Sequence, residues 1–258
     1  MYLCENYPRR VEKYFNISYE FDPSAVQERI AQQVAGECAG YVCVADANIL
    51  QQVHNDLEYR KVVDGAMFSI CDSSWVPVFL KWIYGIERGQ YCGSSIFKEV
   101  IEMKRYRQFF MGTSTRTLNA LKENLVKMDP AIADMTFYEL PFLDVEDFDY
   151  PAIAEMVNND NPDIIWVALG APKQEIFMSK LKPYLRRGVQ IAVGAAFKFY
   201  SGLEEKRAPG WMRKVKLEFL YRIYADPKKQ YARCKQIVSS LPRILREERR
   251  RMRSEAVG

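Results

Sequence analysis

The amino-acid sequence predicts a Rossmann-like α/β fold: a mostly parallel sheet with helices on both faces, followed by a basic helical C-terminal appendage. Short apolar runs bounded by turn residues alternate with segments of helical periodicity along the chain. The 258 residues are enough for one large domain with an appendage, and basic charge gathers at the C-terminal end. We therefore expect an α/β domain over residues 1–203 and the appendage over residues 204–258.

The most informative segment contains two apolar runs, residues 164–169 and 190–195, which are predicted to be buried strands. Each ends at a glycine, Gly170 or Gly194, and a helix is expected between them over residues 172–185. Ligands of such units bind beyond the carboxyl ends of the strands, where the N–H groups of a helix start favour an anion. The candidate phosphate or nucleotide-sugar loop comprises Gly170, Ala171, Pro172, Lys173, Gln174 and Glu175.

This loop is neither a Walker A loop nor a GxGxxG fingerprint, and its glycines could merely punctuate the strand ends. On the facing side, Gly194, Ala195 and Ala196 keep the second turn small, so that a ligand can approach the backbone.

The other elements follow the same alternation. Strands are expected at residues 11–19, 41–45, 66–71, 108–111 and 137–140, and helices at residues 25–34, 49–63, 75–84, 96–105, 115–128 and near 153–158. Ser24 is expected to cap the first of these helices, and Ser94 or Ser95 the fourth.

Polar side chains follow two of the expected strands at the point where α/β folds bind ligands. Asp46 and Asn48 follow residues 41–45, and Asp72 follows residues 66–71. Asn48 and Asp72 could instead be N-caps of the helices that come next.

Composition argues against several classes of protein. The six cysteines are scattered without a CxxC pair, which indicates reduced thiols in a cytoplasmic protein. His54 is the only histidine, which argues against a zinc site or a Ser-His-Asp triad. We expect neither a signal peptide nor a membrane-spanning helix. Asp147-Phe148-Asp149 has the DxD form of a metal-binding motif, but helix capping explains it better.

The C-terminal segment is strongly basic. Of the 37 basic and 33 acidic residues, 16 and 5 lie from Lys206 onward, which leaves 21 and 28 in the rest of the chain. A helix is expected over residues 211–224, and two further helices are expected to be punctuated by Pro227 and Pro242. The segment could be docked helices with a solvated basic face, or could meet anionic lipid. A nucleic-acid arm is disfavoured because no DNA- or RNA-reading module accompanies it.

The motifs GAPKQE, GAAFKF, SG…RAPGW and LEFLYR resemble the WecG/TagA/CpsF family of bacterial glycosyltransferases. The resemblance extends over roughly residues 11–231 and is densest over residues 163–222.

This resemblance implies inverting transfer of a sugar from a UDP-sugar to a polyprenyl-diphosphate-linked saccharide, in cell-surface polysaccharide or teichoic-acid-type synthesis. It implies a peripheral protein on the inner face of the bacterial membrane, without an obligatory metal or cofactor, and a homo-oligomer is possible. Asp72 matches the family's proposed base. The implied donor-binding residues are Asp46, Asn48, Gly170, Pro172, Lys173, Gln174, Glu175, Gly194, Ala195, Phe197 and Lys198. The implied diphosphate, acceptor or membrane-docking residues are Arg207, Arg213, Lys214 and Arg222.

The sequence departs from the family pattern at two strand ends. Lys198 replaces the aspartate of GAAFDF, and Asp46 replaces the threonine of a Thr-x-Asn sequence. Our hypothesis is a charge exchange, in which Lys198 and Asp46 pair or jointly read the sugar. The transferred sugar could therefore be N-acetylmannosamine, its uronate, or a hexose such as glucose. The alternative function is a catalytically degenerate nucleotide-sugar-binding or scaffold protein on the same fold.

Overall fold

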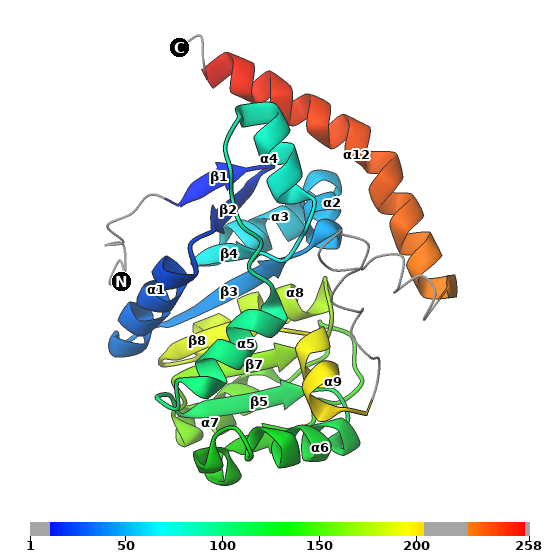
Figure 1. Cartoon of the computed structure of the whole chain (residues 1–258). Helices are drawn as coiled ribbons and strands as arrows, with labels where there is room; N and C mark the ends of the chain where they lie inside the picture. The colour runs from blue at the N-terminus through cyan, green and yellow to red at the C-terminus, as the bar shows by residue number, and fades with distance from the viewer. Residues whose placement is uncertain (1–10, 204–226, 256–258) are drawn as a thin grey trace.

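The computed structural model describes residues 11–203 and 227–255, and one eight-stranded sheet runs through this part of the chain (Figure 1). Its strands are β1 (Glu12–Tyr14), β2 (Ile17–Glu20), β3 (Ala39–Ala45), β4 (Phe68–Cys71), β5 (Gln108–Gly112), β6 (Thr136–Tyr138), β7 (Ile164–Ala168) and β8 (Gly188–Ala192). Their order is β1-β2-β4-β3-β8-β7-β5-β6, and every neighbouring pair except β1 and β2 is parallel. The predicted α/β class with a mostly parallel sheet is confirmed.

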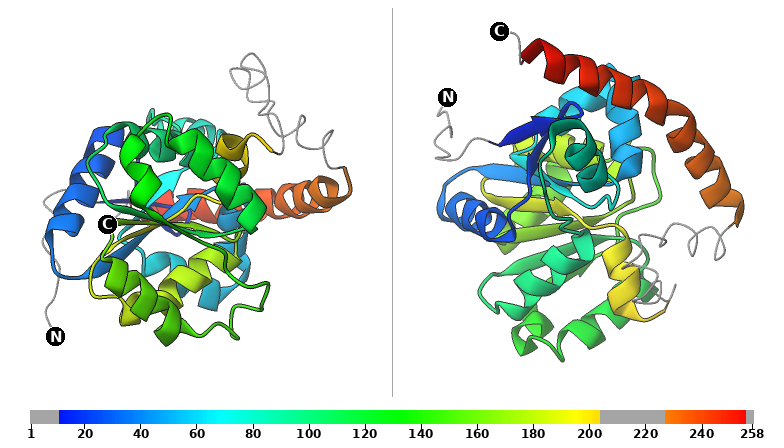
Figure 2. Two further views of the ribbon diagram at one scale, coloured as in Figure 1. Left: turned by 90° about the horizontal axis from the view of Figure 1, so that it is seen from below. Right: turned by 45° about the horizontal axis from the view of Figure 1, so that its top comes forward.

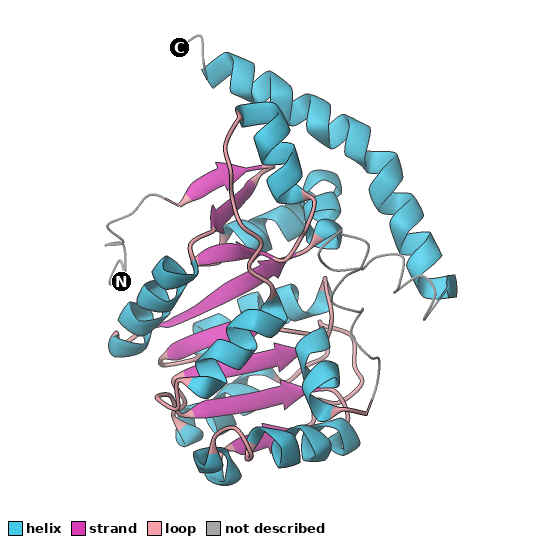
Figure 3. Ribbon diagram, viewed as in Figure 1, coloured by secondary structure: helices cyan, strands magenta, loops and turns pink. Residues whose placement is uncertain are grey.

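Helices cover both faces of this sheet (Figures 2 and 3). They are α1 (Pro23–Ala35), α2 (Ala47–Asn55), α3 (Leu57–Asp64), α4 (Val76–Tyr84), α5 (Gly93–Glu102), α6 (Thr115–Leu125), α7 (Tyr150–Asp160), α8 (Lys173–Leu181), α9 (Ala195–Ser201) and α12 (Pro227–Glu255). The side chains of β7 alternate between two cores. Trp166 packs with α1, α5, α6 and α9, whereas Ile165 and Val167 pack with α7 and α8. All three are fully buried, as expected for a strand covered on both faces.

The first expected strand, residues 11–19, is instead an antiparallel hairpin of β1 and β2. Phe15 and Asn16 form its two-residue turn, with φ angles of 52° and 60°. Two successive left-handed residues have the handedness that closes a tight hairpin without splaying its strands. Phe15 is fully buried there, and its packing offsets the unusual backbone of a non-glycine residue.

Two expected helix starts are wrong. Asp22, rather than Ser24, caps α1, and its carboxylate accepts the N–H of Ser24 at 3.0 Å. Helix α5 starts at Gly93, ahead of Ser94 and Ser95, and has no side-chain cap on its own element. Both shifts have the same cause. The carboxylate that accepts an exposed N–H group at the helix start lies outside the helix, and it is Asp22 for α1 and Asp72 for α5.

The helix expected over residues 49–63 is two helices, α2 and α3. Asp56 separates them by adopting an extended backbone, and its side chain accepts the N–H groups of Glu58 and Tyr59 at 2.9 and 3.0 Å. A carboxylate that caps a new helix in this way competes with continuation of the old one.

The two expected C-terminal helices are one, α12, and Pro242 lies inside it. A proline in this position costs one backbone hydrogen bond, but it does not end the helix here. Ile244, two residues later, is buried in a core shared with the hairpin, α2, α3 and α4. Docking of the helix against the body thus compensates for the proline. The described helices include none that combines the length and apolar character needed to cross a bilayer.

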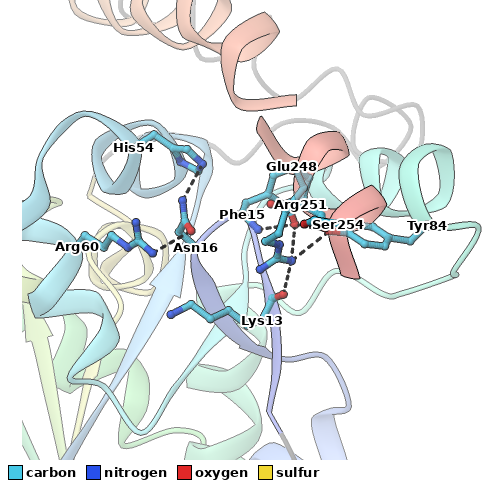
Figure 4. A network of polar contacts seen from close by, with 9 residues as sticks. All are labelled: Lys13, Phe15, Asn16, His54, Arg60, Tyr84, Glu248, Arg251 and Ser254. Atoms are coloured by element: carbon cyan, nitrogen blue, oxygen red, sulfur yellow. Dashed lines mark hydrogen bonds and ion pairs between the residues drawn. The ribbon is translucent and has the colours of Figure 1, made fainter. Parts of the chain in front are cut away.

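Glu248 fastens α12 to the body (Figure 4). Its side chain is 3% exposed, and Oε1 accepts the Phe15 N–H at 2.9 Å, the Tyr84 hydroxyl at 2.7 Å and Arg251 Nη2 at 2.8 Å. Arg251 Nη2 also donates to the Lys13 carbonyl at 2.6 Å. One carboxylate oxygen therefore joins α12 to the hairpin turn and to the end of α4. The first residues of the expected appendage, residues 204–226, lie outside the described residues, and its division from the body as a functional domain stays a prediction.

We expect Glu248→Ala to lower the free energy of unfolding by about 2–4 kcal/mol, because it leaves buried donors and a half-buried guanidinium without their acceptor. Glu247→Ala is the matched control. Its carboxylate is half exposed and pairs loosely with Arg243 at 3.7 Å, so the change should stay within about 0.5 kcal/mol. Urea unfolding of both variants measures the difference, and equal effects would contradict this role of Glu248.

Candidate functional site

The candidate site lies at the carboxyl edge of the sheet, where parallel strands bring their ends together. Ala45 at the end of β3 pairs with Cys71 at the end of β4. The next residues, Asp46 and Asp72, therefore leave adjacent strands at the same level, and the Asp72 N–H donates to the Ala45 carbonyl at 3.0 Å. On the other side of β3 lies β8, followed by β7, so the turns at Gly194 and Gly170 open at this edge too.

Asp72 is not the N-cap of the helix that follows it. The N-cap residue of α4 is Trp75, and the Ser73 hydroxyl before it accepts the N–H groups of Trp75 and Val76 at 3.3 and 3.4 Å. Asp72 instead reaches across to α5, where Oδ1 accepts the N–H of Gly93 at 3.1 Å. The positive N-terminus of α5 favours the charged carboxylate. Its position at the sheet edge is thus set by a helix that starts 21 residues later.

Asp46 is the N-cap of α2, and its Oδ1 accepts the N–H groups of Asn48 and Ile49 at 2.9 and 3.0 Å. The capping alternative for Asn48 is therefore wrong, and its partly buried side chain lies in the first turn of α2. The charge-exchange hypothesis, in which Lys198 and Asp46 pair or jointly read the sugar, stays a prediction.

The side chain of Gln174 lies between the two glycine turns. Its Oε1 accepts the N–H of Gly170 at 3.0 Å. A Cβ at Gly194, where φ is 30°, would lie 3.2 Å from the same oxygen, closer than side chains normally approach. Gly194 is thus required both by its backbone conformation and by the close passage of Gln174. The N–H of Gly170, which we expected to face an anion, is already used inside the protein.

Glu175 lies behind the loop and is fully buried. Its Oε1 accepts the Gln174 side-chain N–H at 2.9 Å, and its Oε2 accepts the Tyr59 hydroxyl at 3.2 Å. The pKa of Glu175 is raised to about 7, chiefly by burial and to a lesser extent by Asp46, while the hydrogen bonds from Gln174 and Tyr59 act to lower it. We expected Glu175 to bind the donor, but its side chain is fully buried behind the loop. It instead orients the side chain of Gln174 through a hydrogen bond.

Lys173 also differs from its expected role. Its ammonium donates to the Leu143 carbonyl and lies 5.6 and 5.2 Å from the ring centres of Phe142 and Phe148. The segment before α7 thus binds the Lys173 ammonium through one carbonyl oxygen and two aromatic rings. Pro172 is the N-cap residue of α8 and follows a cis peptide bond from Ala171.

Helix α9 presents two of its three candidate residues to solvent. Ala195 and Lys198 are exposed, whereas Phe197 is fully buried. The ring of Phe197 packs 5.7 Å from Phe97 and 6.1 Å from Phe110, centre to centre. The aromatic residue of GAAFKF is therefore a core residue that anchors α9, because a fully buried ring cannot touch a ligand.

The DxD-like sequence is structural. Asp149 caps α7 by accepting the Ala152 N–H at 3.0 Å, and Phe148 is buried in the core. His54 is also structural, since its Nδ1 lies 2.9 Å from the Leu50 carbonyl and burial lowers its pKa. Across residues 11–203 and 227–255, no three His, Cys, Asp or Glu side chains gather as a metal site would require.

A cavity of about 490 Å³ opens at the opposite, amino edge of the sheet, beside the start of β3. Its lining includes Cys38, Ser179 and Lys182. It contains none of the candidate residues, and ligands of parallel α/β sheets bind at the carboxyl edge. We therefore place the candidate site around Asp46, Asp72 and the Gly194 turn.

Other candidate residues lie outside the part of the chain that the structure describes: Arg207, Arg213, Lys214 and Arg222. Conversely, sequence reasoning missed Tyr59 and the bridging role of Gln174. Tyr59 lies 116 residues before its partner Glu175, and no local pattern marks such a contact.

Comparison with known proteins gives one family and several distant relatives. Residues 14–254 match the model of the glycosyl transferase WecG/TagA/CpsF family. A Bacillus subtilis (strain 168) protein is 27% identical over 175 residues, which cover 67% of this chain and 66% of the relative. A Bacillus spizizenii protein is 25% identical over 81% of this chain and 80% of the relative. A Staphylococcus aureus (strain NCTC 8325) protein is 23% identical over 81% of both chains. All three are named N-acetylglucosaminyldiphosphoundecaprenol N-acetyl-beta-D-mannosaminyltransferase.

The buried carboxyl of Glu175 predicts a pH-dependent stability. Because its folded pKa, about 7, lies above the unfolded value of about 4.3, its contribution is fully present below pH 4.3 and is lost as the pH rises through 7. Glu175→Gln is neutral throughout, so the wild-type stability relative to this variant should fall by about 1–3 kcal/mol between pH 5 and pH 8. Urea unfolding at both pH values measures it. The exposed Glu58→Gln serves as control, and a difference that is independent of pH would contradict the prediction.

Proposed function

The chain belongs to the WecG/TagA/CpsF family of glycosyl transferases, and we propose that it moves a sugar from a UDP-sugar to a polyprenyl-diphosphate-linked saccharide. The observation that carries the proposal is the position of Asp72, a carboxylate fixed at the carboxyl edge of the sheet by the Gly93 N–H. The relatives' printed name, which describes transfer to a lipid-linked N-acetylglucosamine, supports the choice of acceptor. The product belongs to cell-surface polysaccharide or teichoic-acid-type glycan synthesis.

Asp72 is the proposed general base. In an inverting transfer, the acceptor hydroxyl attacks C1 of the donor sugar from the face opposite UDP. Its proton passes to the Asp72 carboxylate as the new C–O bond forms and the bond between C1 and the diphosphate breaks. The hydrogen bond from the Gly93 N–H orients the Asp72 carboxylate. The donor is a backbone group, so this orientation does not depend on a second flexible side chain.

The departing UDP needs positive or hydrogen-bonding partners. We propose that the backbone of the Gly194-Ala195 turn and the basic residues Arg207 and Arg222 supply them, with Arg213 and Lys214 meeting the acceptor diphosphate or the membrane. Gly170 contributes indirectly, since Gln174 occupies its N–H. We expect turnover to be independent of added divalent metal.

Sugar selection is assigned to Asp46, Asn48 and Lys198. Asp46 follows β3 and Lys198 is exposed on α9, which starts just after the neighbouring strand β8. The relatives' name makes N-acetylmannosamine the first donor to test, and a lysine in place of the family's aspartate keeps its uronate and glucose on the panel. The protein would act on the cytoplasmic face of the membrane, where its basic C-terminal part meets anionic lipid.

Replacing Asp72 by Asn should lower acceptor-dependent UDP release at least about 100-fold. Asparagine keeps an oxygen that can accept the Gly93 N–H but cannot take a proton at neutral pH, so the fold is preserved while the base is lost. The assay uses a panel of UDP-sugars with a short-chain polyprenyl-diphosphate-GlcNAc analogue, and the exposed Asp134→Asn is the control.

Each result of this assay has a separate meaning. Release that Asp72→Asn leaves unchanged would refute the role of Asp72. Absence of release from every donor, with UDP still bound, would favour the nucleotide-sugar-binding or scaffold alternative.

The identity of the donor gives a second prediction. If Lys198 reads a uronic carboxylate, Lys198→Asp should reverse the ratio of kcat/KM between UDP-N-acetylmannosaminuronate and UDP-N-acetylmannosamine, because a carboxylate would then face a carboxylate. Lys127→Asp makes the same charge change beyond the end of α6 and should leave the ratio unaltered. A ratio that is the same in both variants and the wild type would remove Lys198 from sugar selection.

A further inference from the structure

The cavity at the amino edge of the sheet lies opposite the candidate site and has no part in the mechanism proposed above. It is bordered by the start of β3, by the residue after α3, and by the end of α8 with the short 3-10 helix η2 (Lys182–Tyr184). Its volume of about 490 Å³ is within the range of sites for small organic molecules. Its lining therefore requires an explanation of its own.

Two cations without an acidic partner line this cavity. Lys182 and Arg186 take part in none of the ion pairs formed within the described part of the chain. The next residue, Arg187, is by contrast neutralised by Asp163 at 2.6 Å and also donates to the Val34 carbonyl at 3.0 Å. The fold thus pairs one arginine internally and leaves the two cations of the cavity to a ligand.

Helix polarity explains only part of this positive charge. The C-terminus of α8 carries about half a negative charge, and Lys182 at its C-cap position complements it. The Lys182 ammonium also lies 5.6 Å from the ring centre of Tyr41, which helps to hold it in the cavity. Arg186 comes four residues later, beyond the helix, and is exposed. Against these two cations the lining sets one acidic side chain, Glu37, so that one positive charge remains.

The rest of the lining suits the organic part of an anionic ligand. Ala39, Pro183 and Leu185 supply apolar surface, and Ser179 supplies a hydroxyl. Small-molecule sites typically combine such apolar surface with a few polar groups that fix the orientation of the ligand. A phosphate monoester carries about two negative charges at neutral pH, which match the two cations. Arginine binds phosphate through paired N–H groups, and lysine binds it as a point charge.

Two helices connect this cavity with the candidate site. Helix α8 runs from the Gly170–Glu175 loop to the cavity, and its nine residues cover about 14 Å. Helix α3 is bonded to the same loop, because the Tyr59 hydroxyl donates to Glu175 at 3.2 Å. Three residues later, the Val62 carbonyl of α3 accepts the hydroxyl of Tyr41, which lines the cavity. The cavity wall and the loop therefore share both helices.

We propose that this cavity is an effector site for a small phosphate monoester. The phosphate binds between Lys182 and Arg186, and its organic part packs on Pro183 and Leu185. Because α3 and α8 join the two edges, the bound effector changes the affinity for UDP, and UDP changes the affinity for the effector by the same factor. The proposal goes beyond the proposed function, and binding of the effector does not rest on it.

Alkylation of Cys38 measures occupancy of the cavity directly. Its partly exposed thiol lines the cavity, whereas the partly exposed Cys92 precedes the Gly93 N–H that binds Asp72 at the other edge. Labelling of the full-length protein by iodoacetamide is followed at each cysteine by peptide mass spectrometry, with phenyl phosphate as the probe. With a Kd of about 1 mM, phenyl phosphate at about 10 mM should slow the labelling of Cys38 roughly tenfold and leave Cys92 unchanged.

Two related compounds test the chemistry of the ligand. Phenol has the ring without the charge, and benzoate has one negative charge in place of about two. Each should slow the labelling of Cys38 less than about twofold at the same concentration. Equal protection by phenol, or equal slowing at Cys38 and Cys92 by phenyl phosphate, would overturn the proposed site.

The two cations provide matched variants. Lys182→Gln/Arg186→Gln should abolish the protection of Cys38 by phenyl phosphate. Lys104→Gln/Arg105→Gln removes the same charges at the same edge, from exposed residues before β5 that do not line the cavity, and should keep the protection. Protection that survives Lys182→Gln/Arg186→Gln, or that is missing in the wild type, would refute the site.

Calorimetric titration of UDP tests the connection between the two edges. Phenyl phosphate should change the Kd of UDP at least about fivefold in the wild type and leave it unchanged in Lys182→Gln/Arg186→Gln. A change that persists in this variant would be competition at the candidate site and would contradict the effector role. An unchanged Kd in the wild type would contradict it too.

The labelling experiment also separates this proposal from the proposed function, because it needs neither donor nor acceptor. Protection of Cys38 in a protein that releases UDP from no donor would refute only the transferase activity. Release of UDP by a protein in which phenyl phosphate does not protect Cys38 would refute only the effector site.

Discussion

Parallel pairing of the central strands is the constraint on which the rest of the structure depends. Strands β2 to β8 all point the same way, so each return must cross a face of the sheet, and the helices that make these crossings bury both faces. The same constraint gathers every strand end at one edge. The same edge therefore brings together residues that are far apart in the chain: Asp46, Asp72 and the turns at Gly170 and Gly194.

Buried polar groups turn this edge into an ordered site. A carboxylate without water must find hydrogen-bond donors, and Glu175 finds them in Tyr59 of α3 and Gln174 of its own helix. Gln174 in turn takes up the Gly170 N–H and passes close to Gly194. One buried residue thus relates the loops after two neighbouring strands. Asp72 follows a similar logic, since the start of α5 supplies its anchor. The residues of the candidate site are thus positioned by residues that lie outside it.

The C-terminal helix is part of the same architecture. Ile244 completes an apolar core and Glu248 receives donors from the hairpin turn, α4 and α12. Removal of this part of the chain would therefore strip the body of packing as well as charge, and internal substitutions are better probes of its function than truncation.

The sequence by itself determined the α/β class, the approximate position of nearly every strand, the glycine turns and the occurrence of Asp72 at a strand end. These features are local, because hydrophobic periodicity and turn residues act over a few positions. Tertiary structure alone decided that residues 11–20 form a hairpin, that Phe197 and Glu175 face inward, and that Lys173 turns toward the segment before α7. It also decided the contact between Glu248 and Phe15, which are 233 residues apart. No local pattern encodes such contacts, because they form only when separate elements pack and buried polar groups must find partners.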